Sequence, residues 1–434
     1  MSQLIEQVLI EQNPHWNGIS YHHTLMRTHD KEALADLTLP EIQIVTGIRR
    51  CGKSTLLQTL INHLMSQVEA KSLLYINFDD PNYLEMCNNP SSLYSIVTTA
   101  EKLTASSVSY LFLDEVQNLQ SWEKYVKSVY DIKRFRKIIV TGSNAELLAG
   151  NYATLLSGRY IETRIYPLTF REFLLNNAIS NRFELVKQKA KTLALLDSML
   201  NFGSFPRIHD LPDPAVKRKL LKSYYETLLL KDCISNHAVR DTKAFINLAH
   251  YLISQAANLY SYNSLSKIIG SNETTIQNFI QILENAYFIE ELKNFSYSLK
   301  TQTKAKKKIY CIDNGLITAT TFKFSNNYGK LLENLIYTEL RKQHKKIYFS
   351  HDAIECDFIV HEENPLAIQS CYEFTADNRE RELKGLLNAM EKFSIPQGLI
   401  ITYDYEENFS DRIKILPFWK WAAFPDDIPL PGLI

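Results

Sequence analysis

The segment TGIRRCGKSTLL constrains the fold of this chain more than any other part of its sequence. From Gly47 onward it fits the pattern G-x-x-x-x-G-K-[ST], in which glycines let backbone N–H groups close around a chain of phosphates. A β-rich run, EIQIVTG, precedes the pattern, and the segment STLLQTLINHLM after it repeats apolar side chains at helical spacing. Strand, loop and helix together predict a nucleotide-binding α/β core. The predicted nucleotide-binding residues are Gly47, Ile48, Arg49, Arg50, Cys51, Gly52, Lys53, Ser54 and Thr55.

Two further residue types are expected of a nucleotide hydrolase, and the run YLFLDEVQ supplies both. Lys53 is predicted to contact the β and γ phosphates, and the Ser54 hydroxyl to bind Mg²⁺. Asp114, at the end of the apolar run, is predicted to complete the magnesium shell. Glu115 is the predicted general base that activates the attacking water. ATP and Mg²⁺ are therefore the expected cofactors.

A third strand-like run, KIIVTGSN, ends in Ser143 and Asn144, either of which is a candidate to contact the γ phosphate or the water. An ordinary polar strand end is an equally good reading of this pair. With SLLYINFDD before and YIETRIYPL after, five strand-like runs alternate with helical stretches. Such alternation predicts a parallel sheet with helices on both faces.

The motifs TGIRRCGKSTLL, FLDEVQNLQSWEKYVKSVYD, VTGSNAELL, LLSGRYIETRIYPLTFREF, KIYCIDNGL and LLENLIYTELRK give the chain a resemblance over nearly its whole length. It resembles the prokaryotic AAA-type P-loop ATPases that carry a winged-helix region and a C-terminal restriction-endonuclease-like domain. The resemblance implies an α/β chain whose parallel-sheet ATPase core is followed by a helical lid with a winged helix and a small nuclease-like domain. It also implies that Arg159 in LSGRY reads the γ phosphate, in cis or from a neighbouring copy; a surface ion pair is the alternative. The expected domains are an N-terminal helical segment 1–40, the core 41–195, the lid and winged helix 196–325 and the nuclease-like domain 326–434.

The segment SYNSLSKIIGSNETTIQNFIQILENAYFIEEL predicts two helices separated by Gly270 and followed by a strand, the order of a winged helix. DNA contact is one reading of its polar positions and of the lysines in the following segment LKTQTKAKKKIY. A lid or protein contact, with a merely solvated basic loop, is the other. The candidate DNA-binding residues are Thr274, Thr275, Gln277, Asn278, Lys304, Lys306, Lys307 and Lys308.

The C-terminal segment departs from the nuclease pattern that it resembles. That pattern places a Glu on a helix, an Asp on a strand and Glu-x-Lys on the next strand, and Glu333 and Asp357 match its first two positions. Gln369 and Cys371 occupy the other two, so one metal carboxylate and the lysine are missing from their expected places. We therefore predict a degenerate, non-cleaving nuclease-like domain.

The composition of the chain limits the classes of function but does not identify one. The 48 basic residues balance 48 acidic residues, so a nucleic-acid contact has to come from a local basic patch. The sequence shows neither a signal-peptide pattern nor an apolar run of membrane-span length, which predicts a cytoplasmic protein. The six cysteines are expected to be reduced, and Cys51 beside basic residues at a helix start is expected to be a reactive thiolate.

Together these features predict an ATP-hydrolysing AAA-type switch or motor that acts on DNA. The alternative is an ATP-gated signalling or scaffold protein whose C-terminal parts bind proteins. ATP and ADP are the expected small-molecule partners, and both a protein partner and a homo-oligomer remain open.

Overall fold

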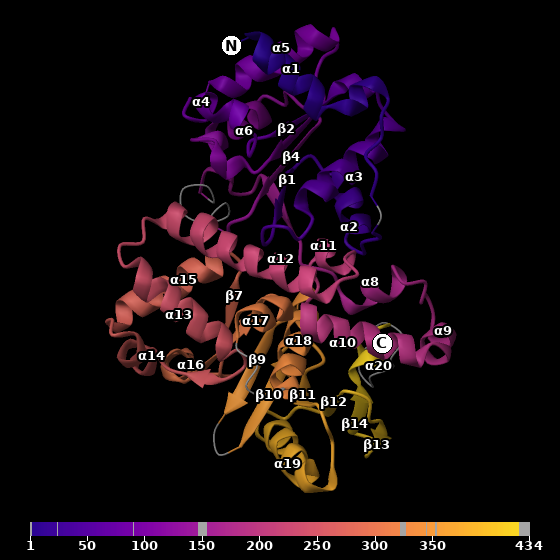
Figure 1. The fold of residues 1–434 in the computed structure, drawn as a ribbon, viewed down its shortest axis with the longest axis vertical. Helices are drawn as coiled ribbons and strands as arrows, with labels where there is room; N and C mark the ends of the chain where they lie inside the picture. Colours follow the sequence, from indigo (N-terminus) through magenta and orange to yellow (C-terminus); the bar gives the residue numbers. More distant parts are fainter. Residues whose placement is uncertain are drawn as a thin grey trace. The chain divides into compact units, whose positions relative to one another are not determined.

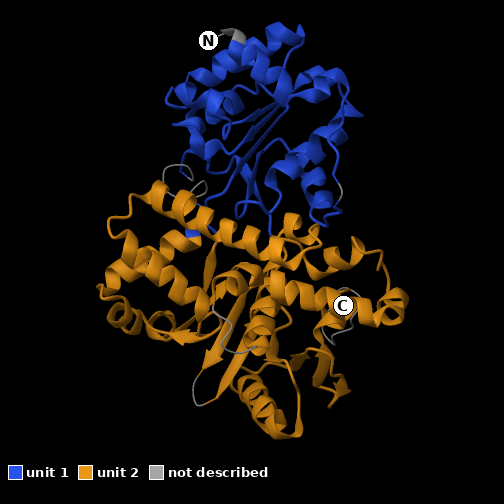
Figure 2. Ribbon diagram, viewed as in Figure 1, with its two compact units in different colours: residues 1–166, 285–287 blue, residues 167–284, 288–434 orange. Residues whose placement is uncertain are grey.

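The computed structural model describes residues 2–23, 25–89, 91–145, 154–321, 327–343, 345–351 and 354–424. The chain forms two compact units, drawn in different colours in Figure 2 and labelled by element in Figure 1. Unit 1 comprises residues 1–166 with 285–287, and unit 2 comprises residues 167–284 with 288–434.

Unit 1 is built on a five-stranded parallel sheet with the strand order β2-β3-β4-β1-β5. Every residue of β1 is buried, because a parallel sheet between two helical layers hides both of its faces. The predicted parallel sheet is confirmed. The strands are β1 Ile42–Thr46, β2 Leu73–Asn77, β3 Tyr110–Asp114, β4 Lys137–Gly142 and β5 Tyr160–Arg164.

The helices of unit 1 bury their apolar stripes against this sheet. The stripe expected after the phosphate loop lies inside α3, where Leu56, Leu57, Leu60, Ile61 and Leu64 are all buried. The α-helices are α1 Ser2–Gln12, α2 Asp30–Ala35, α3 Lys53–Met65, α4 Leu84–Cys87, α5 Ser92–Thr104 and α6 Trp122–Asp131. Short 3₁₀ turns are η1 Pro14–Asn17, η2 Asp36–Thr38, η3 Ala70–Ser72, η4 Pro81–Tyr83 and η5 Val116–Asn118.

Unit 2 begins with helices that lead into a three-stranded antiparallel sheet of order β6-β8-β7. The predicted pair of helices around Gly270 is confirmed, and Gly270 ends the first of them with a φ of 78°, where a side chain would be strained. The elements are α8 Phe170–Leu175, α9 Arg182–Lys187, α10 Lys189–Phe202, α11 Pro206–His209, α12 Pro214–Thr227, the π-helical η7 Leu228–Ser235, α13 Thr242–Ser254, β6 Leu259–Tyr260, α14 Tyr262–Ile269, α15 Glu273–Asn285, β7 Ile289–Lys293, α16 Leu299–Lys304, β8 Lys307–Cys311 and α17 Asn314–Thr320.

The rest of unit 2 is a six-stranded mixed sheet of order β13-β14-β12-β11-β10-β9. It lies beside the three-stranded sheet, because the Phe295 N–H donates to the Phe349 carbonyl of β9 at 2.7 Å. The elements are α18 Tyr328–Lys342, β9 Ile347–His351, β10 Glu355–Val360, β11 Leu366–Cys371, α19 Ala376–Lys392, β12 Gln397–Thr402, β13 Glu407–Asn408, β14 Ile413–Pro417 and α20 Phe418–Trp421.

The unit boundary at Tyr166 differs from the predicted boundary at residue 195. The segment after Tyr166 is tied to unit 2 by polar contacts between residues far apart in sequence. Lys342 Nζ donates to the Leu168 carbonyl at 2.7 Å, and the Asp313 carboxylate accepts from the Ser204 N–H at 2.6 Å. Residues 196–325 and 326–434 likewise fall into one compact unit rather than two.

In the described part of the chain, none of the helices combines the length and apolar character that crossing a membrane requires.

Candidate functional site

The phosphate loop of unit 1 has backbone angles that only glycine adopts without strain. Gly47 has a φ of 142°, and a Cβ there would lie 2.2 Å from the Ile165 carbonyl oxygen. Gly52 precedes α3 with a φ of 113°, and a Cβ there would lie 3.2 Å from an Arg27 guanidinium nitrogen. The two glycines of the sequence pattern are therefore required by backbone geometry and close approach, as a loop that wraps a phosphate chain needs.

Lys53 is the first residue of α3, and its side chain is buried within the loop. Its ammonium donates to the Gly47 carbonyl at 3.1 Å and to the Ile48 carbonyl at 3.4 Å. It also lies 3.6 Å from a Glu115 carboxylate oxygen. The structure thus brings the predicted phosphate ligand and the predicted general base into one buried group.

Asp114 ends β3 and is completely buried. Its carboxylate accepts from the Tyr75 hydroxyl at 2.7 Å and from the hydroxyls of Thr141 and Ser54. Burial, followed by the charge of Glu115, raises the pKa of Asp114 above its ordinary value. A buried carboxylate beside the Ser54 hydroxyl is a hard-oxygen donor pair of the kind that Mg²⁺ binds, so the residues present fit this ion.

Glu115 follows directly, in the left-handed backbone region with a φ of 54°. Its carboxylate accepts from the Gln117 amide and from the Ser143 hydroxyl, the latter at 3.3 Å. Burial acts to raise the pKa of Glu115, but Lys53, Arg49 and the Gln117 amide together hold it below its ordinary value. The carboxylate therefore stays ionised, which is the form in which it accepts a proton.

Ser143 and Asn144 follow β4 and are both buried. Ser143 contacts Glu115 and accepts from the Gln117 amide at 3.1 Å, whereas the predicted role of Asn144 at the phosphate stays a prediction. Gln117, Tyr75 and Thr141 also belong to this group and were not predicted from the sequence. Gln117 lies two residues after Glu115 in DEVQ, which was an available signal; the other two lie on separate strands and had none.

The prediction that Arg159 reads the γ phosphate of its own chain is wrong. The Arg159 carbonyl accepts from the Ile42 N–H at 2.8 Å, at the start of β1, whereas the phosphate loop leaves the far end of β1 after Thr46. These ends are separated by roughly 13 Å, at about 3.3 Å per residue. The Arg159 side chain pairs instead with Asp131 at 2.9 Å, which is the surface ion pair named as the alternative. A role at a neighbouring copy stays a prediction.

The prediction that Cys51 is a reactive thiolate is also wrong. The side chain is completely buried, and burial raises the pKa of the thiol despite the opposing charges of Lys53 and Arg27. The Cys51 carbonyl accepts from Arg27 at 3.0 Å, which fixes the loop from the outside. All six cysteines are free and buried.

Of the polar positions named on α15, Thr274, Gln277 and Asn278 are exposed and Thr275 is half-buried. Lys304 and Lys306 are exposed as well, so these residues are accessible to a ligand. That accessibility does not identify the ligand, and DNA contact stays a prediction for all six.

Lys307 and Lys308 are not available to DNA, and their assignment as phosphate contacts is wrong. Both lie on β8 and are buried, rather than in an exposed loop. The Lys307 ammonium donates to the Thr303 carbonyl at 3.1 Å and lies 4.6 Å from the centre of the Tyr262 ring. Lys308 is completely buried in unit 2 among acidic side chains.

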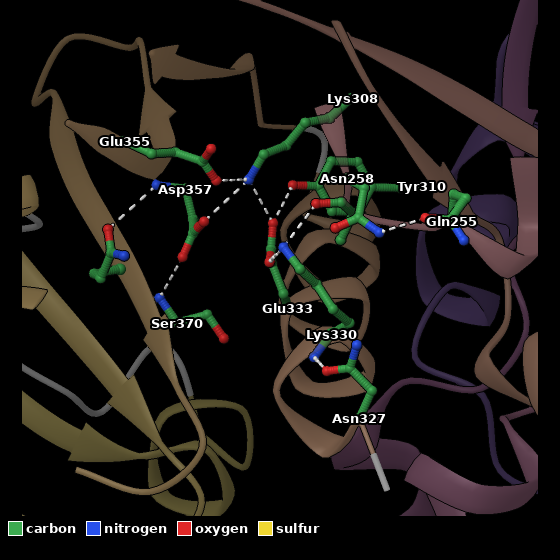
Figure 3. A network of polar contacts seen from close by, with 12 residues as sticks. Gln255, Asn258, Lys308, Tyr310, Asn327, Lys330, Glu333, Glu355, Asp357 and Ser370 are labelled. Atoms are coloured by element: carbon green, nitrogen blue, oxygen red, sulfur yellow. Dashed lines mark hydrogen bonds and ion pairs between the residues drawn. The ribbon is translucent and has the colours of Figure 1, made fainter. Parts of the chain in front are cut away.

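Three acidic side chains surround Lys308, two of them from the predicted degenerate nuclease site (Figure 3). Glu333 of α18 and Asp357 of β10 lie together as predicted, and Glu355 of β10, which was not predicted, joins them. Lys308 Nζ lies 2.7 Å from Glu333, 2.6 Å from Glu355 and 3.0 Å from Asp357. The sequence around the acidic residues cannot reveal this lysine, since it is 25 residues away from Glu333.

Gln369 and Cys371, the two altered positions, have other partners. Gln369 accepts from the Asp357 N–H at 3.3 Å and donates to Glu382 at 2.8 Å. The Cys371 thiol donates to the Glu373 carbonyl at 3.3 Å, and burial raises its pKa to about 12. Neither side chain offers the charged group that the nuclease pattern has at these positions.

A pocket of about 530 Å³ opens beside this cluster. Carboxylates and cationic groups both line it, so it has no single charge. Its lining includes Lys330, Glu333, Glu355, Asp357, Gln369 and Arg381.

The chain is similar to known protein families and to proteins of other organisms. Residues 40–174 match the family described as AAA domain, and residues 193–327 match a domain of unknown function (DUF8612). An uncharacterised protein of Methanocaldococcus jannaschii is 32% identical over 403 residues, covering 88% of this chain and 88% of its own length. An uncharacterised protein of Haemophilus influenzae is 28% identical over 389 residues, covering 88% of this chain and 94% of its own.

Among solved structures, the ORC1 protein of Aeropyrum pernix in complex with DNA is 9% identical, with a TM-score of 0.33, over 74% of this chain and 94% of that one. A signal transduction ATPase with numerous domains from Pyrococcus horikoshii is 12% identical, with a TM-score of 0.30, over 75% of this chain and 46% of that one. Likeness at this level transfers neither a function nor a partner. The identity and coverage of the methanogen relative establish that this chain belongs to the same family as that protein, with an AAA domain as its N-terminal part.

Proposed function

We propose that unit 1 binds MgATP and hydrolyses it, and that the chain acts as a nucleotide-driven switch on DNA. The observation that carries the ATPase part is the continuous buried group of Lys53, Glu115, Gln117 and Ser143. This group joins the Lys53 ammonium, which would bind phosphate, to the ionised Glu115 carboxylate. Asp114 and Ser54 lie next to it and would bind Mg²⁺.

The role of each side chain in hydrolysis follows from its charge and from the groups that it contacts. The phosphate chain takes over the Lys53 ammonium from the Gly47 and Ile48 carbonyls, to which it now donates. Ser54 and Asp114 would hold Mg²⁺, which would supply positive charge to offset the negative charge that develops on the phosphates. Glu115, released from the ion pair with Lys53, accepts a proton from the attacking water. Gln117 orients the Glu115 carboxylate through one of its two oxygens.

DNA as the target of the switch rests on unit 2. We infer that α13 through β8 form a winged helix, because α13, β6, α14, α15, β7 and β8 follow the order of the motif, with the short helix α16 inserted between its last two strands. Thr274, Gln277 and Asn278 present hydrogen-bonding groups on α15, and Lys304 and Lys306 add charge near the wing. These groups are suited to base edges and phosphates respectively.

One assay separates the parts of this proposal. ATP turnover is measured with full-length protein alone and with double-stranded, single-stranded and branched DNA, together with DNA affinity of the Glu115→Gln protein in ATP and of wild type in ADP. We expect Mg²⁺-dependent turnover and a difference in DNA affinity between the two nucleotide states. Turnover without any DNA binding at low salt contradicts the DNA part and favours a protein partner. Absence of turnover in every condition contradicts the ATPase part.

A further inference from the structure

The acidic cluster of unit 2 already contains a cation that belongs to the chain. Resemblance to restriction-endonuclease-like domains implies a divalent ion held by Glu333 and Asp357. Oxygens of Glu333, Glu355 and Asp357 do lie within 4.8 Å of one another, as metal ligands would. The Lys308 ammonium, however, lies between all three. We propose that Lys308 is the resident cation of this site and excludes a divalent metal ion from it.

The distances describe an ammonium site rather than a loose surface contact. Lys308 Nζ has three hydrogens, and three carboxylate oxygens receive them at 2.6 to 3.0 Å. A magnesium ion binds oxygens at about 2.0–2.1 Å and a calcium ion at about 2.3–2.6 Å, so either would require the carboxylates to close in on the space that Nζ fills.

Glu333 and Asp357 also accept from other donors. Glu333 Oε1, which accepts from Lys308, accepts from the Tyr310 hydroxyl at 2.8 Å as well, and Glu333 Oε2 accepts from Lys330 Nζ at 2.8 Å. The second Asp357 oxygen accepts from the Ser370 N–H at 3.0 Å. A metal ion would have to displace these donors as well as Lys308, and would stand beside a second ammonium, that of Lys330.

The backbone prevents Lys308 from withdrawing as an exposed lysine does. Lys308 lies on β8, the central strand, paired with Leu259 of β6 and with Leu292 of β7. Its ammonium is enclosed, with the Phe349 ring centre 5.7 Å away.

The inference is independent of the proposed ATPase, since all its residues belong to unit 2. It predicts that a metal site appears when Lys308 is removed. Mn²⁺ binding is measured by calorimetry and by electron paramagnetic resonance on full-length protein without nucleotide. The proteins are wild type, Asp357→Asn, Lys308→Met, Lys308→Met with Asp357→Asn, and Lys330→Met as the matched control that also removes a lysine from Glu333.

We expect Lys308→Met to bind one additional Mn²⁺, about tenfold or more tightly than any site in wild type, and to melt at a higher temperature when Mn²⁺ is present. The additional site disappears when Asp357→Asn is combined with it, and Lys330→Met behaves as wild type. A folded Lys308→Met protein that binds no more Mn²⁺ than wild type overturns the proposal.

The comparison of wild type with Asp357→Asn tests the proposal without any substitution of Lys308. Wild-type Mn²⁺ binding that is unchanged by Asp357→Asn supports the proposal, and binding that Asp357→Asn abolishes overturns it. If Lys308→Met folds only with Mn²⁺, the ion has replaced the ammonium, as expected. If it folds in neither condition, the comparison of wild type with Asp357→Asn decides.

Discussion

The Lys53 ammonium lies 3.6 Å from a Glu115 carboxylate oxygen, inside a region from which water is largely excluded. In this arrangement each residue neutralises the other while no phosphate is present. A bound phosphate chain competes for the same ammonium, so nucleotide binding and the freedom of the base are linked through a single ion pair. Substitutions at its two ends are therefore expected to have different effects.

Lys53→Ala is expected to weaken MgATP binding by about 2–3 kcal/mol, because it removes a charge-assisted interaction with phosphate. Glu115→Gln is expected to retain binding and to lower the turnover rate by about 10²–10⁴-fold, because only proton acceptance is removed. Equilibrium binding of a fluorescent nucleotide and single-turnover hydrolysis distinguish the two. Lys71→Ala removes an exposed lysine of the same unit and serves as the control. Wild-type turnover in Glu115→Gln would falsify the assignment of the base.

Gln117→Leu is expected to shift the pH dependence of turnover. The Gln117 amide is one of the groups that lower the pKa of Glu115, so its removal leaves that pKa higher. Since the base acts when ionised, the acidic limb of the rate profile should move to higher pH, and the maximal rate should fall. Gln67→Leu, at an exposed glutamine, is the control. An unshifted acidic limb would show that Gln117 has only a structural role.

Alkylation of Cys51 should be slow in the native protein, with or without ATP, because the thiol is buried and its pKa is raised. All six thiols are expected to react only when the chain unfolds, since all are buried. Mass spectrometry of protein treated with iodoacetamide, in buffer and in denaturant, measures this. Rapid labelling of Cys51 in buffer that ATP suppresses would contradict this expectation and support the reactive thiolate predicted from the sequence.

Lys304→Ala combined with Lys306→Ala is expected to weaken DNA binding. The slope of log affinity against log salt concentration should become shallower by about 0.9 for each phosphate that a lysine no longer neutralises. The effect should be similar for unrelated DNA sequences, because ammonium groups interact with the backbone charge. Fluorescence anisotropy across a range of salt concentrations provides the slope. Lys71→Ala with Lys102→Ala, lysines of unit 1, is the matched control. An unchanged slope would remove these two lysines from the DNA interface.

Glu284→Gln is expected to stabilise unit 2 at alkaline pH. Burial, together with Glu291 and Glu290 and against Lys293, raises the pKa of Glu284 from 4.5 to about 7. A raised pKa means that the folded state favours the protonated acid, so wild type loses stability as pH rises from about 4.5 to about 7. The free energy of unfolding of Glu284→Gln should exceed that of wild type by about 1–3 kcal/mol at pH 8 and match it near pH 4.

Glutamine keeps the acceptor for the Glu291 N–H, which Glu284 holds at 2.8 Å, so the comparison isolates the charge. Glu273→Gln, at the exposed start of the same helix, is the control. Urea unfolding at several pH values measures the difference. A difference that did not change between pH 4 and pH 8 would contradict the raised pKa.

The phosphate loop and the acidic pair after β3 were predictable because each is a contiguous motif whose chemistry is local. Gly47 and Gly52 shape the backbone of one loop, Lys53 begins the helix directly after it, and Asp114 and Glu115 are consecutive residues where a single buried strand ends. The apolar stripe of α3 and the alternation of strands and helices were readable for the same reason, since each depends on neighbours a few residues away.

Only the tertiary structure decided the contacts between distant segments. The sequence places Arg159 between the fourth and fifth strands of the core. Whether it lies at the phosphate-loop end of β1 or at the opposite end depends on the parallel pairing of β5 with β1. Lys308 looks like one member of a solvated basic run, yet the central position of β8 buries it against Glu333 and Asp357, which come from a helix and a strand later in the chain. A charge pattern cannot tell a phosphate-binding lysine from a buried one, because burial is decided by how strands pair and pack, and these pairings join residues far apart in sequence.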